Sequence, residues 1–387
     1  MQACQLSIII PTRNRYETLI PVVHAINSNI IGNSYEIVIQ DNSDNNEEML
    51  DYLKSNFHNS IKYFYTDQPI SMVENTELAL SHAEGNYWTF IGDDDIVSPY
   101  ILKIIELMDY NKVNCLSYAI GNYFYTDLTF NKQYGFNNPA TLQVTNQPSL
   151  DFKELFCENE LEKVLNIGGV YCLKLPRLYH GVVKKELMLK IKDKYGQFIP
   201  GPCPDMTLSI ALALQINNYH YIEYPVTITG SSRKSEGGKG VSQKHIVEVK
   251  NKEWLSKNVE QEWSPKIPKI FTRETIWAQS IFHVLNVSRI EKSINYLKLY
   301  ENMYFSCPDF VLQYINNTIK ENKINIHISQ IIKWKSKRII RKLLFKCPSI
   351  CLEFVMHIRG DYKKYLKIDN LKTIDACIIY LKNYKVI

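Results

Sequence analysis

The chain has 387 residues, of which 45% are hydrophobic, and this length suits a main domain with an appendage. It has no apolar run of about 18 residues and its polar start lacks a signal-peptide pattern, so we expect neither a transmembrane nor a secreted protein. A net charge of +5 hides an asymmetry, because residues 1–250 carry 21 Lys and Arg against 28 Asp and Glu, whereas residues 251–387 carry 24 against 12.

Apolar runs of strand length alternate with amphipathic helical stretches in the first part of the chain. The predicted strands cover residues 6–10, 35–40, 61–65 and 87–92, and the predicted helices cover residues 17–28, 47–57 and 71–82. The strands contain consecutive apolar residues, which is typical of strands buried on both faces of a parallel sheet. This order predicts a doubly wound, mostly parallel α/β fold whose ligands bind at the carboxyl ends of the strands.

Polar clusters stand at the carboxyl ends of three predicted strands. They are Thr12–Arg15, Asp41–Asp44 and Asp93–Asp95. Because the carboxyl ends of parallel strands lie along one edge of a sheet, we expect the clusters to converge on one site. Adjacent carboxylates repel one another, and a hard divalent ion such as Mg²⁺ or Mn²⁺ with a diphosphate would compensate the last cluster. The alternative is a solvated acidic turn that caps the next helix, which Ser98 and Pro99 would open.

A proline-rich segment precedes a predicted apolar helix over residues 206–216. Pro200, Pro202 and Pro204 favour an extended chain, and Asp205 follows them at the start of the helix. From these residues alone, Asp205 is best interpreted as a helix N-cap.

A glycine-rich basic segment, residues 231–240, follows a strand-like run over residues 224–229. Its glycines and cations suit a mobile lid that closes over a diphosphate. Segments of this composition are also common as merely flexible loops, and both interpretations remain open.

Residues 251–387 form a predicted helical, basic C-terminal region beside a main domain of residues 1–250. The densest charge lies in residues 333–346, where seven basic residues surround an aliphatic face. With successive residues about 100° apart, that face consists of Ile332, Ile339, Ile340, Leu343 and Leu344. Such a helix can lie on an anionic membrane surface, or it can pack its aliphatic face on the protein. Nucleic acid would suit the charge, but no recognition motif accompanies it, so no nucleic acid is expected.

The nine cysteines are scattered and odd in number, as expected of reduced structural thiols. Cys347 and Cys351 are the one close pair, and no neighbouring residues complete a zinc site. This usage agrees with a cytoplasmic protein.

Four motifs together resemble a known family. IIIPTRNR, IQDNSDNNEE, NTELALSHAEGNYWTFIGDDDI and PDMTLSIALA stand in the order and spacing of family 2 glycosyltransferases with the GT-A fold, over roughly residues 5–235. Residues 227–239 are similar to those of bacterial members that build surface polysaccharides. The resemblance implies a metal-dependent, inverting enzyme that uses Mn²⁺ or Mg²⁺ and moves a sugar from a nucleotide-sugar, typically a UDP-sugar. The implied acceptor is a hydroxyl group of a growing glycan or polyprenyl-linked glycolipid.

The resemblance also assigns roles on the donor side. They are Pro11, Thr12 and Arg13 around the nucleotide base, Asp41 as acceptor of the uracil N–H, Asn75 on the helix after the third strand, and Asp93 at the ribose or sugar. Asp94 is the implied metal ligand, and Asp95 is either a second ligand or the cap of the next helix. No basic residue lies in Ser71–Glu74, where relatives place a positive charge near the diphosphate. We therefore expect residues 231–240, with Lys234, to supply that charge.

On the acceptor side, Asp205 matches the family's general base, which deprotonates the acceptor hydroxyl. This role reverses the interpretation of Asp205 as a simple cap. His180 is better interpreted as structural, with an acceptor contact as the alternative, and His245 is a candidate third metal ligand.

Two other functions are alternatives to glycosyl transfer. A sugar nucleotidyltransferase shares the sheet and the metal, but its glycine-rich phosphate loop would follow the first strand, where this chain has PTRNR. A non-catalytic, membrane-associated assembly protein would be expected to lack the site residues, and Asp41, Asp93–Asp95 and Asp205 are all present. We therefore expect a cytoplasmic glycosyltransferase, peripheral at the inner face of the plasma membrane and held there by its basic C-terminal region.

Overall fold

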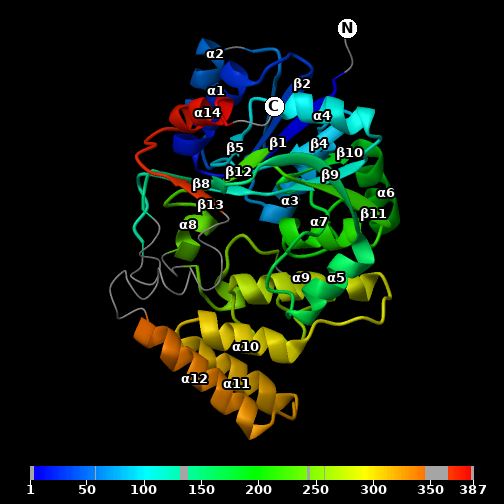
Figure 1. The fold of residues 1–387 in the computed structure, drawn as a ribbon, viewed down its shortest axis with the longest axis vertical. Helices are drawn as coiled ribbons and strands as arrows, with labels where there is room; N and C mark the ends of the chain where they lie inside the picture. Colours follow the sequence, from blue (N-terminus) through cyan, green and yellow to red (C-terminus); the bar gives the residue numbers. More distant parts are fainter. Residues whose placement is uncertain are drawn as a thin grey trace.

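The computed structural model describes residues 4–56, 58–130, 138–241, 245–256, 258–344 and 365–384. A central sheet of eight strands has the order β3-β2-β1-β4-β10-β6-β11-β9 (Figure 1). Its strands are β1 (Leu6–Thr12), β2 (Tyr35–Asp41), β3 (Ile61–Tyr65), β4 (Tyr87–Phe90), β6 (Cys115–Tyr118), β9 (Ser149–Phe156), β10 (Gly181–Lys184) and β11 (Asn218–Glu223). The pairs β1–β2, β2–β3, β1–β4 and β6–β11 are parallel, whereas β9 and β10 run antiparallel to their neighbours. The predicted α/β class with a mostly parallel sheet is confirmed.

Helices follow the first strands where the sequence predicts them. They are α1 (Tyr16–Asn29), α2 (Glu47–Ser55), α3 (Met72–Ser81) and α4 (Ile101–Tyr110), followed by α5 (Cys157–Asn166), α6 (Lys185–Tyr195), α7 (Pro204–Ala213) and α8 (Glu236–Val241). A capping box sets the start of α3, because Ser71 and Glu74 each accept a hydrogen bond from the other's backbone N–H. The helix α7 begins at Pro204, which suits a first helical position because proline has no N–H to leave unpaired.

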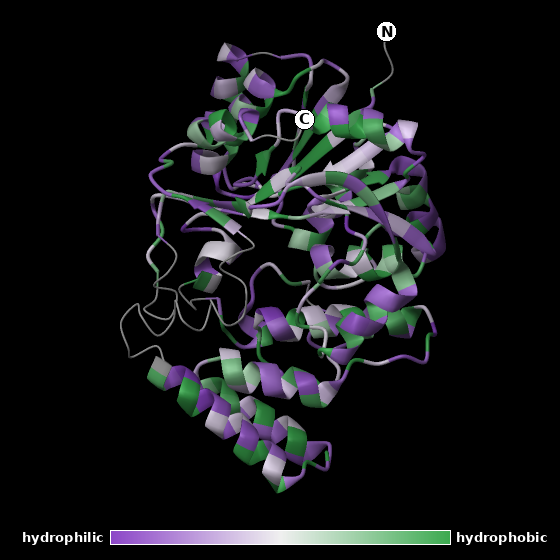
Figure 2. Cartoon of the chain, in the orientation of Figure 1, coloured by the Kyte–Doolittle hydropathy of each residue, from purple (hydrophilic) through white to green (hydrophobic). Residues whose placement is uncertain are grey.

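The strand register aligns the polar ends of β1 and β2, since Thr12 pairs with Asp41. Successive residues of β1 face opposite sides of the sheet. Ile9 joins one hydrophobic core, and Ile8 and Ile10 join the other. Figure 2 shows these hydrophobic strands in the interior, with helices around them. Burial on both faces explains why the apolar runs of the sequence are unbroken.

A second sheet of five strands has the order β13-β8-β7-β12-β5. Its strands are β5 (Ile96–Val97), β7 (Gly121–Phe124), β8 (Thr141–Thr145), β12 (Thr227–Ser231) and β13 (Tyr365–Ile368). The strand β12 pairs antiparallel with β5 and parallel with β7. Because β5 begins directly after Asp95, this pairing brings residues around 230 to the acidic triplet. The sequence predicts a strand near β12, but it does not predict this sheet.

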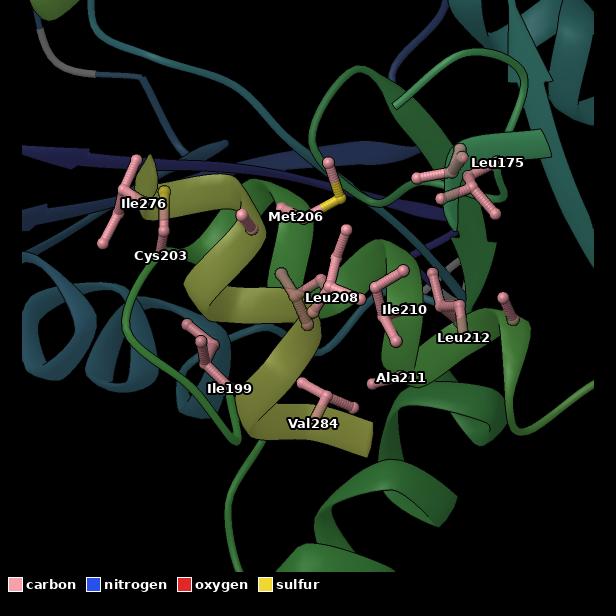
Figure 3. Packing of buried hydrophobic residues seen from close by; sticks show 14 of the residues in the cluster. Leu175, Ile199, Cys203, Met206, Leu208, Ile210, Ala211, Leu212, Ile276 and Val284 are labelled. Carbon is pink, nitrogen blue, oxygen red and sulfur yellow. The ribbon is translucent and has the colours of Figure 1, made fainter. Parts of the chain in front are cut away.

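The C-terminal helices extend from one end of the molecule (Figure 1). They are α9 (Arg273–Val287), α10 (Tyr296–Ser306), α11 (Leu312–Glu321) and α12 (Ile328–Leu344), with short 3₁₀ helices at Val249–Asn251 and Asp309–Val311. The helix α9 packs against α7, and Figure 3 shows Ile276 and Cys203 close together near the starts of the two helices. The main hydrophobic core therefore continues across residue 250 into the C-terminal helices.

The last described segment returns to the first part of the chain. The strand β13 pairs with β8, and α14 (Ile374–Lys382) packs against α1. The predicted division into residues 1–250 and 251–387 is therefore corrected, because neither the core nor the sheets separate at residue 250.

No helix in the described ranges is long and apolar enough to cross a membrane. The described cysteines are all free thiols, in agreement with the sequence-based prediction. Cys347 and Cys351 lie outside the described residues.

Candidate functional site

The first and third polar clusters meet at the edge of the main sheet, where β1 and β4 end side by side. The Thr12 hydroxyl donates to Asp93 Oδ2 at 2.6 Å, and Arg15 Nε donates to the same oxygen at 3.0 Å. A second guanidinium nitrogen of Arg15 forms an ion pair with Asp93 Oδ1, and the third lies 3.8 Å from Asp94 Oδ1. The predicted convergence of these two strand ends is confirmed.

The cation beside the acidic cluster is Arg15, which the sequence pattern does not single out. Asn14, with a φ of 56°, turns the chain between the two arginines, so Arg13 lies 3.8 Å from exposed Asp44 while Arg15 reaches Asp93. Asparagine tolerates this left-handed conformation better than most residues. The role of residues 231–240 in supplying positive charge stays a prediction, and Arg15 is a further cation at the site.

Asp93 and Asp94 differ in what their oxygens contact. Burial raises the pKa of Asp93 to about 7, although the charge of Arg15 opposes this rise. Burial also raises the pKa of Asp94, again against the charge of Arg15. Asp94 Oδ2 accepts from the Ser232 backbone N–H at 3.1 Å and from the Ser232 hydroxyl at 2.7 Å. Asp94 Oδ1 faces Arg15 and is the oxygen that a bound ligand could share.

The acidic cluster by itself is an incomplete metal site. Within the ranges that the structure describes, no three His, Cys, Asp or Glu side chains are grouped closely enough to hold an ion. Mg²⁺ is commonly held by one or two carboxylates together with substrate phosphates, and Asp94 fits that arrangement. His245 packs edge-on against Phe271, with ring centroids 6.5 Å apart, so its predicted role as a third ligand is not supported.

Asp95 is a structural residue. Its Oδ1 accepts from Gly230 N–H at 2.7 Å, and its Oδ2 accepts from Gly92 N–H at 2.6 Å and lies 3.2 Å from His180 Nε2. The prediction that Asp95 caps the next helix is wrong, because β5 follows it and the N-cap of α4 is Tyr100. Its predicted role as a second metal ligand is not supported, because both oxygens are fully buried and already hydrogen-bonded.

His180 and Gly230 attach the second sheet to the acidic cluster. The His180 ring lies 2.6 Å from the Thr227 hydroxyl and 3.1 Å from the Thr229 hydroxyl, and it is buried, which confirms its structural role. A Cβ added at Gly230 would lie 1.7 Å from the Asp94 carbonyl oxygen, so only glycine allows this approach. Burial alone would raise the pKa of Asp95, but the charge of His180 holds that pKa below its ordinary value.

We expect the Asp95→Ala variant to lose about 3 to 5 kcal/mol of unfolding free energy, because the change leaves His180 and two backbone N–H groups buried without their acceptor. Urea denaturation measures this loss. The matched control is Asp51→Ala, which removes an exposed carboxylate paired with Lys54 and should change stability by less than about 1 kcal/mol. Equal stability of the two variants would show that Asp95 does not hold the sheets together.

Asp41 is less accessible than the resemblance implies. Its Oδ2 accepts from the hydroxyls of Tyr16 at 2.5 Å and Tyr63 at 2.7 Å, and its Oδ1 accepts from Ser43 N–H at 2.8 Å. The carboxylate is fully buried. Its contact with a uracil N–H stays a prediction, and that contact requires one tyrosine hydroxyl to move aside.

The other predicted donor-side residues lie on three elements around the cluster. Pro11 is half-buried within β1. The Asn75 side chain on α3 donates to the Thr12 carbonyl at 3.1 Å, which ties the end of β1 to the helix. Lys234 Nζ lies 2.7 Å from Glu17 Oε1, so the segment before α8 is attached to α1 beside Arg15. No ligand contact tests these assignments, and they remain predictions.

Asp205 lies in the first turn of α7, whose N-cap is Cys203, so the interpretation of Asp205 as the N-cap is wrong. Its Oδ1 accepts from Met206 N–H at 2.7 Å and from the Cys203 thiol at 2.8 Å. Its Oδ2 accepts from the Trp277 indole N–H at 2.9 Å. Trp277 belongs to α9, about 70 residues away, and no local sequence signal could have paired it with Asp205.

Tyr179 contacts the acidic cluster. Its hydroxyl donates to Asp95 Oδ2 at 3.2 Å. Burial, followed by the charges of Asp95, Asp94 and Asp205, raises the pKa of Tyr179 well above its ordinary value. That Asp205 and the acidic cluster form one site stays a prediction.

Comparison with known proteins finds similar glycosyltransferases. The family model described as Glycosyl transferase family 2 matches residues 7–162. The abequosyltransferase RfbV of Salmonella typhimurium is 28% identical over 261 residues, which are 63% of this chain and 72% of that protein.

Two solved structures are also similar. The complex of S. aureus TarS 1-349 with UDP-GlcNAc has a TM-score of 0.46 and 13% identity, over 92% of both chains. The mannosyltransferase PcManGT from Pyrobaculum calidifontis, with GDP-Man and Mn²⁺, has a TM-score of 0.44 and 11% identity, over 88% of this chain and 85% of that one.

The matched residues 7–162 contain β1, β2, β4 and the clusters that end them, including Arg15 and Asp93–Asp95. The match over these residues favours glycosyl transfer over nucleotidyl transfer or a non-catalytic role. Residues 7–162 of the chain are therefore similar to family 2 glycosyltransferases, and 63% of the chain is similar to a bacterial glycosyltransferase.

Proposed function

We propose that this enzyme transfers a sugar from a UDP-sugar, with inversion at the anomeric carbon, to a hydroxyl group of a glycan or polyprenyl-linked glycolipid in bacterial surface-polysaccharide synthesis. The observation that carries this proposal is the cluster of Arg15, Asp93 and Asp94 where β1 and β4 end. Asp205, in the first turn of α7, is the candidate base for the acceptor hydroxyl. The relative RfbV, by its name, also transfers a sugar.

On the acceptor side, Asp205 takes the proton of the acceptor hydroxyl. The oxygen then attacks the anomeric carbon as the bond to the nucleotide diphosphate breaks on the opposite face, which inverts the configuration. Met206 N–H and the Trp277 indole N–H hold the carboxylate in one orientation.

On the donor side, Arg15 provides a fixed positive charge for the departing diphosphate. Thr12 and Ser232 orient Asp93 and Asp94. Asp94 Oδ1 would hold Mn²⁺ or Mg²⁺, and the bound ion would neutralise charge on the leaving group as a Lewis acid.

A panel of nucleotides tests the donor class. UDP with Mn²⁺ should raise the melting temperature more than CDP, GDP or ADP with Mn²⁺, because a ligand stabilises the folded state in proportion to its excess over its dissociation constant. Greater stabilisation by another nucleotide would reassign the donor. Absence of stabilisation by every nucleotide would overturn the proposed donor site.

Membrane attachment through α12 is the second part of this proposal. The aliphatic side chains Ile332, Ile339 and Leu343 are 59%, 58% and 57% exposed. This exposure argues against the alternative in which the aliphatic face packs on the protein. Solvent-exposed aliphatic residues between lysines are typical of helices that lie in a membrane interface.

The buried face of α12 carries Trp334 and Arg338 instead. Arg338 donates to the carbonyls of Tyr304 and Cys307, and it pairs with Asp309. Arg338 therefore holds the helix in place and is not available to lipid. The lysines that flank the exposed face, Lys333 and Lys335, remain suited to anionic headgroups.

We expect the wild type to co-sediment with phosphatidylglycerol-containing vesicles at low salt and to dissociate as salt rises. The triple change Ile332→Ser, Ile339→Ser and Leu343→Ser should weaken vesicle binding by about tenfold or more, because each aliphatic side chain contributes about 1 kcal/mol or more when it leaves water. Exposed Leu50→Ser on α2 is the matched control. Failure of the wild type to bind vesicles at either salt concentration would remove the membrane from the proposal.

A further inference from the structure

Two exposed side chains, Tyr171 and Arg273, and the partly buried Trp277 form a stack beside Asp205, which we call the aromatic platform. The Arg273 guanidinium carbon lies 4.9 Å from the centroid of the Tyr171 ring and 5.5 Å from that of the Trp277 ring. Trp277 in turn donates its indole N–H to Asp205 Oδ2 at 2.9 Å. The platform is therefore connected directly to the proposed base.

The start of α9 holds the platform in position. Arg273 is the first residue of α9, and a capping box between Thr272 and Thr275 fixes that helix start. The neighbouring Ile276 packs into the core between α9 and α7, close to Cys203 (Figure 3). This packing determines where Trp277, one residue further on, meets Asp205.

Two members of the platform are exposed to solvent. Tyr171 is 48% exposed, and the Arg273 side chain is 46% exposed although it also contacts Glu274 at 3.5 Å. Large aromatic residues elsewhere in this part of the protein, such as Trp88 and Phe198, are buried in the core. Aromatic surface left open beside a few convergent polar groups is the composition of a ligand site.

We propose that the aromatic platform is the acceptor subsite, and that the acceptor sugar carries an anionic group, a phosphate or a carboxylate, which Arg273 binds. The inference rests on the proposed role of Asp205 as general base. The C–H face of a pyranose ring packs on Tyr171 and Trp277, which places one of its hydroxyls at Asp205. The guanidinium forms charge-assisted hydrogen bonds with the anion, and such bonds are stronger than neutral ones.

Fluorine NMR tests this subsite in the full-length protein labelled with 5-fluorotryptophan. The resonance of Trp277 is assigned from its loss in Trp277→Phe. UDP and Mn²⁺ are added in excess to occupy the donor site, and their binding is recorded in the same sample. The probes are methyl glycosides, 1-phosphates and methyl uronides of glucose, galactose and mannose. The neutral, phosphate and carboxylate arms thereby separate the two sources of negative charge.

We expect the Trp277 resonance to shift on titration, with an anionic form of at least one sugar bound about tenfold or more tightly than its neutral glycoside. Arg273→Gln should remove that difference, and Tyr171→Ala should weaken the neutral and anionic forms together. Tyr110→Ala, which removes an exposed tyrosine on α4, is the matched control and should change neither.

Three results separate the possible failures. If UDP binds but no pyranoside shifts the Trp277 resonance, or if Tyr171→Ala binds sugars as the wild type does, the platform is not the subsite. Equal binding of neutral and anionic forms would remove Arg273 from the proposal. If sugars bind at Trp277 but UDP does not bind, the proposed donor fails while the subsite stands.

Discussion

Asp205→Asn should slow sugar transfer by about 10² to 10⁴, the usual contribution of a positioned general base, while UDP affinity stays within about twofold of the wild type. The amide keeps an oxygen acceptor for Met206 N–H, so α7 should form. It cannot take the acceptor proton. Its NH₂ group also replaces the oxygen that faces Trp277, which should cost about 1 to 3 kcal/mol of stability. Initial rates and UDP titration calorimetry, measured on the same preparation, separate the two effects.

The matched control is Asp193→Asn, an exposed carboxylate on α6. It should retain wild-type transfer and stability. Near-wild-type turnover of Asp205→Asn would show that Asp205 only holds the start of α7 against α9. Loss of UDP binding together with transfer would instead indicate a wider disruption of the site.

UDP should bind about tenfold or more tightly with Mn²⁺ than with EDTA, and Asp94→Ala should abolish that difference. The reason is that Asp94 Oδ1 is the carboxylate oxygen left for an ion once Thr12 and Arg15 occupy Asp93 and Ser232 occupies Asp94 Oδ2. Calorimetric titration with UDP in the two buffers measures the effect.

The metal dependence is expected for a reason other than the charge of the acidic triplet. Arg15 already compensates much of the negative charge of the cluster, so the charge of the triplet alone does not require an ion. Asp51→Ala should keep the wild-type dependence on Mn²⁺, since Asp51 lies on the outer side of α2. Equal UDP affinity of the wild type with and without Mn²⁺ would mean that Arg15 alone neutralises the charge of the diphosphate.

Local pattern was sufficient for the first four strands and the place of the site. Their apolar runs are unbroken because both faces of the sheet are covered, and all residues of β1 and β2 except Pro11 are buried. Parallel strands end at one edge, so the convergence of Thr12 and Asp93 follows from the order of strands and helices alone. The family motifs then supplied Asp205, which the residues by themselves favour as a cap.

The roles within the site depend on long-range contacts. Asp93, Asp94 and Asp95 are adjacent in sequence, yet their partners differ. Asp93 contacts Arg15, after β1. Asp94 contacts Ser232, after β12, and Asp95 contacts Gly230, within β12. A short strand such as β5 has no periodic signal, and its pairing with β12 is settled only by the packing of residues more than 100 apart.

The same distinction applies to the C-terminal region. The amphipathic pattern of α12 correctly separates its aliphatic and basic sides, but periodicity cannot say which side faces the protein. The carbonyls of Tyr304 and Cys307, with Asp309, satisfy a buried Arg338, so the aliphatic side is left exposed. Sequence alone determined the first four strands, their polar ends and the resemblance to the family, because those depend on local pattern. Tertiary structure decided the partners of each charged group, because hydrogen bonds and ion pairs depend on which distant segments packing brings together.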